Sequence, residues 1–143
     1  MNQRFFQFAK RAAQNADYKG CNKTSPAIGA VAVYKGSIVA TAWNTNRTSP
    51  LQQYYNKYRF ASNAFPAKSH CETMLIQRLR WKFGDSIQWD KVDIYLYREY
   101  RNGSPADSRC CESCYRMLID LGIKRIFYST AHGYVEEVFK KKT

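Results

Sequence analysis

The sequence contains no apolar run that approaches the roughly 18 residues with which a helix spans a membrane. Its N-terminus carries Gln3, Arg4 and Gln7 among the apolar residues, so it also lacks the continuous apolar core of a secretory signal peptide. Internal repeats, low-complexity tracts and linkers are absent as well. We therefore expect one domain over residues 1–143, without a membrane segment, in the cytoplasm, as a monomer or a small homo-oligomer.

Acidic residues are scarce relative to basic ones. The chain of 143 residues has 11 Asp and Glu against 23 Lys and Arg, which gives a formal net charge of +12. Such an excess attracts polyanions and exceeds what an enzyme of small metabolites needs. The alternative interpretation is a generally basic surface that serves no specific partner.

The cysteine content argues against a disulfide framework, because the chain has five cysteines, an odd number. Three of them, Cys110, Cys111 and Cys114, lie close together beside a helical pattern. Reduced thiols grouped in this way are typical of metal ligands. They indicate a protein that works in a reducing compartment.

The hydrophobic pattern predicts alternating helices and strands. Helical patterns cover residues 4–16, residues 69–83 with Ser69 as the N-cap, and a stretch from Cys111 to Gly122. Apolar runs predict a hairpin buried on both faces at 27–34 and 38–43, a strand at 92–97, and a second hairpin at 123–129 and 134–139. This order predicts an α/β fold, a three-layer α/β/α domain around a mixed five-stranded sheet with a C-terminal β-hairpin.

Two short motifs, HCE at residues 70–72 and CESC at residues 111–114, each begin a predicted helix. Together they offer one imidazole and two thiols, and three protein ligands with an open fourth position are typical of catalytic zinc. The positive end of a helix lowers the pKa of a thiol in its first turn and so favours the thiolate that zinc binds. We therefore predict a Zn²⁺ site with His70, Cys111 and Cys114 as ligands.

Glu72 is the carboxylate that remains beside these ligands. Because residues two apart on an ideal helix differ by about 200° in direction, His70 must lie at the irregular helix start if both side chains are to face the metal. In that position Glu72 can take a proton from the activated water and pass it to the leaving group, a general acid/base role. In the structural alternative, Cys110 completes a closed site of four ligands.

These motifs resemble those of the cytidine deaminase-like superfamily, and the resemblance covers most of the chain. Residues 70–72 are similar to its H-A-E motif, and residues 111–126 to its P-C-x-x-C motif with the following helix and strand, although Cys71 and Cys110 replace Ala and Pro. The resemblance implies a hydrolytic deaminase of cytosine or, less often, of adenine or guanine. It also implies that Asn44 contacts the sugar of the substrate and that the main-chain N–H of Cys71 helps to hold the base.

The segment of residues 44–68 is long for a loop and mixes aromatic with basic side chains. Loops of this length are usually functional, and such a mixture suits a single strand, whose bases stack while its phosphates pair with cations. We therefore name Tyr54, Tyr55 and Tyr58 as candidate substrate contacts, with packing over the core as the alternative. The predicted function is conversion of cytosine to uracil in single-stranded nucleic acid, with DNA favoured over RNA.

Free cytidine, deoxycytidine or one of their nucleotides is the alternative substrate. In the superfamily, a hairpin follows the fourth strand in free cytidine deaminases and many toxin-like deaminases, whereas enzymes that resemble tRNA adenosine, deoxycytidylate and polynucleotide cytidine deaminases have a helix there. Gly133 predicts a hairpin here, so the resemblance speaks against a typical deoxycytidylate enzyme. A non-catalytic, zinc-stabilised nucleic-acid-binding domain is the alternative from another class, and it would have no use for Glu72.

Overall fold

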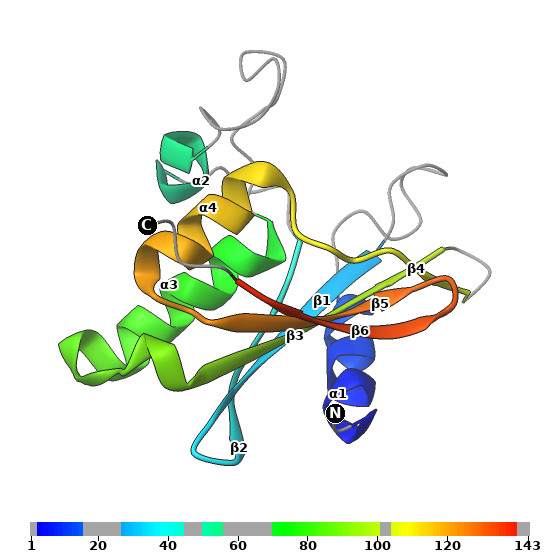
Figure 1. Cartoon of the computed structure of the whole chain (residues 1–143), viewed down its shortest axis with the longest axis horizontal. Coiled ribbons are helices and arrows are strands. Elements are labelled where there is room, and N and C mark those ends of the chain that lie inside the picture. Colours follow the sequence, from blue (N-terminus) through cyan, green and yellow to red (C-terminus); the bar gives the residue numbers. More distant parts are fainter. Residues whose placement is uncertain (1–2, 16–26, 45–49, 56–69, 101–103, 140–143) are drawn as a thin grey trace.

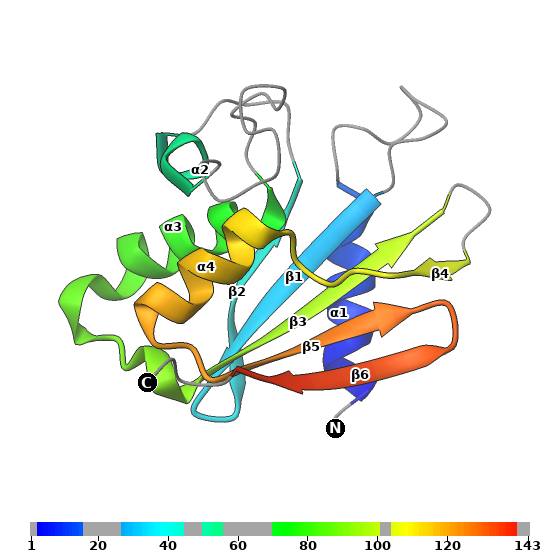
Figure 2. The ribbon, with the colours of Figure 1, turned by 45° about the horizontal axis from the view of Figure 1, so that its top comes forward.

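A mixed sheet forms the centre of the fold (Figures 1 and 2). The computed structural model describes residues 3–15, 27–44, 50–55, 70–100 and 104–139. These residues form six strands: β1 (Ala27–Tyr34), β2 (Ser37–Trp43), β3 (Val92–Glu99), β4 (Pro105–Ala106), β5 (Arg125–Thr130) and β6 (Gly133–Val138). The main order is β2-β1-β3-β5-β6, and β4 pairs with β3. Among the described pairs only β3 and β5 run parallel, so the sheet is mixed, as the sequence predicts.

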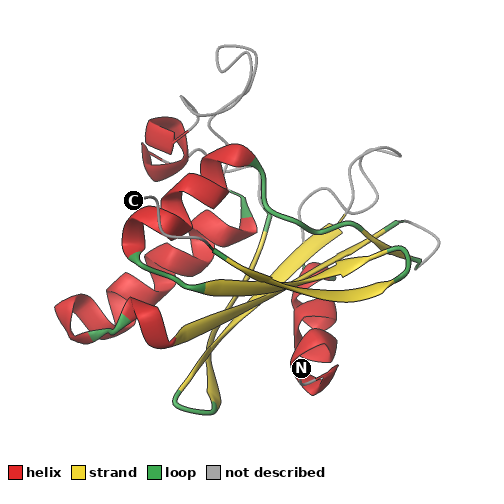
Figure 3. Ribbon diagram, viewed as in Figure 1, coloured by secondary structure: helices red, strands yellow, loops and turns green. Residues whose placement is uncertain are grey.

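Helices cover both faces of this sheet. On one face lies α1 (Gln3–Ala13), and on the other α3 (Cys71–Phe83) and α4 (Glu112–Leu121) lie side by side (Figures 1 and 2). The short helix α2 (Pro50–Tyr55) lies outside this pair, next to α4. The order of layers, visible in Figure 3, confirms the predicted α/β/α fold. None of the helices that the structure describes is long and apolar enough to cross a membrane.

The central strand β3 separates two apolar cores, because successive side chains of a strand point to opposite faces. Ile94 and Leu96 pack in the core beneath α3 and α4, whereas Tyr95 and Tyr97 pack in the core beneath α1. All four side chains are buried. Both predicted zinc motifs lie on the α3/α4 side, at the start of these two helices.

On the other face, α1 approaches β1 closely at Gly29. A Cβ atom at this position would lie 2.2 Å from the carbonyl oxygen of Ala9 and 2.3 Å from the main-chain nitrogen of Ala13. Ala9 and Ala13 are themselves buried. Only glycine allows the backbones of helix and strand to come this close.

The described chain ends in a β-hairpin, in which β6 pairs antiparallel with β5. Gly133 begins β6 with φ 135°, a conformation that other residues rarely adopt. A bidentate ion pair of Arg109 with Glu137 (2.7 and 3.1 Å) ties β6 to the segment that leads into α4. The predicted C-terminal hairpin is thereby confirmed.

Several details differ from the prediction. α1 ends at Ala13, earlier than residue 16, and the N-cap of α3 is His70 and not Ser69. β2 is only partly buried, although burial on both faces was expected, because it is an edge strand of the sheet. The sequence predicts neither α2 nor β4, because elements of 6 and 2 residues are too short to show a periodic pattern.

Candidate metal and catalytic site

The first residues of α3 and α4 meet at one end of the sheet (Figure 2). His70 is the N-cap of α3, Cys111 is the N-cap of α4, and Cys114 lies in the first turn of α4. Their ligand atoms all lie within 4.8 Å of one another. The Nδ1 atom of His70 is 3.5 Å from Cys111 Sγ and 3.4 Å from Cys114 Sγ. The structure thus brings together the three residues that the sequence predicts as zinc ligands.

This set of atoms fits a zinc ion. With Zn–S bonds of about 2.3 Å and a Zn–N bond of about 2.05 Å, tetrahedral angles place nitrogen and sulfur about 3.6 Å apart. The Nδ1–Sγ distances of 3.4 and 3.5 Å are close to that value. Among the described residues no fourth His, Cys, Asp or Glu joins the three. Three protein ligands are typical of catalytic zinc, whereas structural zinc has four.

The two thiols of this cluster differ strongly in acidity. The pKa of Cys111 is lowered to about 3, chiefly by a hydrogen bond with Cys114 and also by the nearby His70. That same hydrogen bond, together with burial, raises the pKa of Cys114 well above its ordinary value. The Ser113 hydroxyl, 3.0 Å from Cys111 Sγ, adds a further hydrogen bond. Cys111 is therefore a thiolate at neutral pH, and metal binding releases the proton of Cys114.

Glu72 lies in the first turn of α3, and only 5% of the residue is exposed. Its carboxylate contacts the Cys71 thiol, with 2.5 Å between Oε1 and Sγ. Its negative charge contributes to the raised pKa of Cys114, so it lies within electrostatic reach of the cluster. His70 precedes the helix with an extended backbone (φ −74°, ψ 162°). It therefore lies at the irregular helix start, as required if the side chains of His70 and Glu72 are to face one site.

Cys71 and Cys110 are two further buried thiols near the cluster. Burial is the main cause of the raised pKa of each, so both stay protonated at neutral pH. Neither belongs to the ligand cluster of the described residues, so the structure does not support the alternative in which Cys110 closes a site of four ligands.

The predicted substrate contacts have different surroundings. Asn44 follows β2 and is buried, and its Oδ1 accepts a hydrogen bond of 3.1 Å from a main-chain N–H of β1. Tyr54 is 57% exposed on α2. Tyr55 packs against the core and hydrogen-bonds to Asp120, at the end of α4 far from the zinc ligands, so the structure does not bring it to the metal cluster. Tyr58 lies outside the described residues.

A buried pair of serines, which no sequence pattern marks, joins the sheet to the segment before α4. The Ser129 hydroxyl donates a hydrogen bond to the carbonyl oxygen of Ala106 (2.8 Å), and the Ser129 N–H donates to the Ser108 hydroxyl (2.7 Å). In return the Ser108 N–H donates to the carbonyl oxygen of Ser129 (2.9 Å). These bonds fix the chain just before the cysteine pair and so position Cys111.

Comparisons with known proteins add to this geometry. A family profile described as the cytidine and deoxycytidylate deaminase zinc-binding region matches residues 1–130. Among curated protein sequences, none matches. The apo structure of dCMP deaminase from the cyanophage S-TIM5 is similar with a TM-score of 0.52 and 22% identity, over 88% of this chain and 79% of that one. Its complex with dCMP and dUMP gives a TM-score of 0.51 and 19% identity, over 88% and 78%. At these identities the likeness concerns the fold.

Proposed function

The chain belongs to the cytidine and deoxycytidylate deaminase family, and we propose that it converts cytosine to uracil at the cluster of His70, Cys111 and Cys114. It is a hydrolytic deaminase that acts on a C–N bond. Membership of this enzyme family sets aside the non-catalytic zinc domain considered above. The observation that carries the proposal is the position of three ligand atoms within 4.8 Å of one another, beside the buried Glu72.

In the proposed reaction each of these side chains has its own task. His70, Cys111 and Cys114 would hold the zinc ion, which when bound supplies activation of water at neutral pH. The Glu72 carboxylate accepts a proton from the attacking water at one oxygen and passes it to the departing amine, while the C4–O bond forms and the C4–N bond breaks. The Cys71 thiol donates a hydrogen bond to Oε1 of Glu72 and so restricts its rotation.

For the substrate we propose cytosine in single-stranded nucleic acid. The net charge of +12 supports a polyanion. Helix α1 contributes Arg4, Lys10 and Arg11 to this charge and contains no acidic residue. The β5–β6 hairpin differs from the helix that typical deoxycytidylate deaminases of the superfamily have at this place, but polynucleotide cytidine deaminases have a helix there too, so the choice between these substrates rests on charge.

Free cytidine or deoxycytidylate is the second candidate. The family description names both compounds, and the structurally similar cyanophage enzyme has been crystallised with dCMP and dUMP. A mononucleotide offers a single phosphate, so this substrate would leave most of the basic surface without a role in binding. For that reason we place it second.

We also propose that the protein works in the cytoplasm as one domain, either as a monomer or as a small homo-oligomer. The four cysteines that the structure describes are all free thiols. A zinc site with two thiolate ligands requires reduced cysteines, which supports a reducing compartment.

Mass spectrometry of the purified, zinc-loaded protein tests the substrate. The protein is incubated in parallel with a single-stranded DNA oligonucleotide, its RNA equivalent, cytidine, deoxycytidine and deoxycytidylate, and Glu72→Gln serves as the control. Replacement of the amine by oxygen raises the mass by about 1 Da per cytosine. We expect this gain in an oligonucleotide. Conversion of the free compounds alone would overturn the nucleic-acid proposal, and undiminished turnover by Glu72→Gln would overturn the role given to Glu72.

A further inference from the structure

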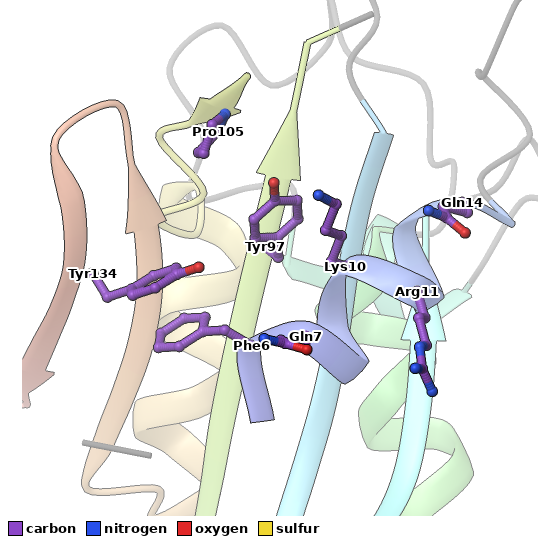
Figure 4. A pocket seen from close by; sticks show the side chains of 8 residues that line it. All are labelled: Phe6, Gln7, Lys10, Arg11, Gln14, Tyr97, Pro105 and Tyr134. Atoms are coloured by element: carbon purple, nitrogen blue, oxygen red, sulfur yellow. The ribbon is translucent and has the colours of Figure 1, made fainter. Parts of the chain in front are cut away.

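A groove of about 510 Å³ lies on the α1 face of the sheet, opposite the zinc site (Figure 4). α1 forms one side, Tyr97 of β3 lies in the middle, and Tyr134 of β6 lies on the other side (Figure 4). The lining residues described by the structure include no Asp or Glu. The Glu99 carboxylate hydrogen-bonds to the Tyr97 side chain beside the lining, while Lys10 and Arg11 belong to the lining itself. Two cations against one carboxylate leave a positive balance, which suits an anion.

The positive charge of the groove comes from Lys10 and Arg11, which are both exposed on α1. The Lys10 ammonium group reaches over the ring of Tyr97, 6.0 Å from its centroid (Figure 4). Arg11 and Arg4 both lie over the ring of Phe8, at 5.4 and 5.8 Å, and extend the basic surface along the helix. Exposed cations at neighbouring positions can neutralise successive phosphates of a strand.

Aromatic rings lie beside these cations. Tyr134 stacks on Phe6, with 3.8 Å between the ring centroids and 13° between the planes (Figure 4). Phe6 is buried, whereas Tyr134 is 37% exposed, so part of its ring remains accessible from the groove. An accessible ring on a fixed support is a stacking platform that accepts any base.

Figure 2 shows that α3 and α4 begin toward the end of the sheet where β3 and β5 end and β6 begins, and Tyr97 and Tyr134 of the groove belong to these ends of β3 and β6. Tyr134 of the groove pairs with Ser129 across the β5–β6 hairpin. Ser129 is hydrogen-bonded to Ser108, which lies three residues before the zinc ligand Cys111. This chain of contacts connects the zinc side of the sheet with the groove.

We propose that this groove binds a segment of single-stranded nucleic acid, with Lys10 and Arg11 on its phosphates and Tyr134 stacked on a base. The inference rests on the proposed substrate. It names the groove as the binding site for the part of the strand that lies outside the zinc site. The groove lies on the other face of the sheet from α3 and α4, so its residues take no part in the chemical step.

Fluorescence anisotropy of a labelled 12-nucleotide single strand tests this site in the full, zinc-loaded chain. The variant Lys10→Gln/Arg11→Gln removes two charges from the groove. Lys91→Gln/Lys124→Gln removes two exposed charges next to the starts of β3 and β5, at the opposite end of the sheet. Two phosphate contacts contribute about 1.4 to the salt slope of a single strand, so at about 0.1 M salt the groove variant should bind about 25-fold more weakly. The control variant should lose much less.

The stacking contact is tested at Tyr134. Tyr134→Leu keeps Phe6 covered but removes the ring, and it should weaken binding about 5- to 150-fold, whereas Tyr134→Phe should bind like the wild type. Equal losses of affinity in the groove variant and the control charge variant would show that only the bulk charge matters, and would overturn the assignment of the groove as a binding site. Unchanged binding by the groove variants would overturn it too.

Binding and turnover are measured separately, so the groove and the proposed substrate can fail independently. If the wild type deaminates only free compounds, the substrate proposal fails, while the anisotropy data still decide whether the groove binds a strand. For an oligonucleotide substrate we expect Lys10→Gln/Arg11→Gln to raise KM and to leave kcat unchanged. A loss confined to kcat would contradict a binding role.

Discussion

Replacing Gly29 with alanine is expected to push α1 away from the sheet. The added Cβ would lie 2.2 Å from the Ala9 carbonyl oxygen and 2.3 Å from the Ala13 nitrogen, whereas ordinary contacts begin at 3.4 Å. Both obstacles belong to the helix backbone, so no side-chain rotation relieves them, and the helix must shift by about 1 Å. Overpacking a core typically costs about 1–3 kcal/mol, and a rigid backbone obstacle places this change near the upper end, about 3 kcal/mol.

Urea unfolding followed by tryptophan fluorescence measures the loss, and Trp43, packed against the core beneath α1, is a suitable probe. Gly122→Ala is the matched control: Gly122 has φ 97° and open space around it, so this change imposes only the left-handed conformation, about 1 kcal/mol. Gly29→Ala should keep its zinc, because α3 and α4 lie on the other face. A loss no larger than that of Gly122→Ala would refute the close approach of α1 to β1.

Three further predictions concern the zinc site. Glu72→Gln should retain zinc and lose about 10²- to 10⁴-fold in kcat/KM. Zinc content and deamination are measured on the same sample, and a loss of zinc would indicate instead that Glu72 is a zinc ligand. In zinc-free protein, iodoacetamide should modify Cys111 first, at a rate that changes little between about pH 5 and 8, because a thiol with a pKa of about 3 is ionised throughout. Peptide mass spectrometry should show that bound zinc protects it, and preferential labelling of Cys110 would contradict the assignment. Ser129→Ala should lower the free energy of unfolding by about 1–3 kcal/mol and weaken zinc binding, because it leaves the buried Ala106 carbonyl oxygen without its donor; urea unfolding and zinc titration check both.

The zinc cluster could be predicted because its geometry follows from local rules. Each motif begins a helix, and the first turn of a helix fixes where a cysteine or histidine points. The spacing of Cys111 and Cys114 places both sulfurs on one side of α4, and the structure confirms that His70 joins them from α3. The extended backbone of His70 also follows from a local argument, the incompatibility of residues 70 and 72 on one helix face.

Other parts of the site depend on contacts between distant segments, which periodicity does not report. Ser108 and Ser129 are 21 positions apart, and their bond exists only because the segment before α4 lies against β5. Similarly, β2 has the apolar composition of a central strand, but the strand order makes it an edge. Tyr55 belongs to a segment whose mixture of aromatic and basic residues suggested a substrate contact, yet its side chain packs against the core and hydrogen-bonds to Asp120 of α4.

The alternation of β3 relates the zinc side of the sheet to the basic groove on its other face. Leu96 supports the core beneath α3 and α4, and the next residue, Tyr97, lies in the groove beneath α1. A slip of one residue in the pairing of β3 would exchange these faces and place a tyrosine hydroxyl in the apolar core. Pairing with β1 over all eight residues of β3 opposes such a slip. The same register therefore keeps Leu96 beneath the helices that carry the zinc ligands and Tyr97 beneath Lys10 of α1, so both sites depend on the pairing of this one strand.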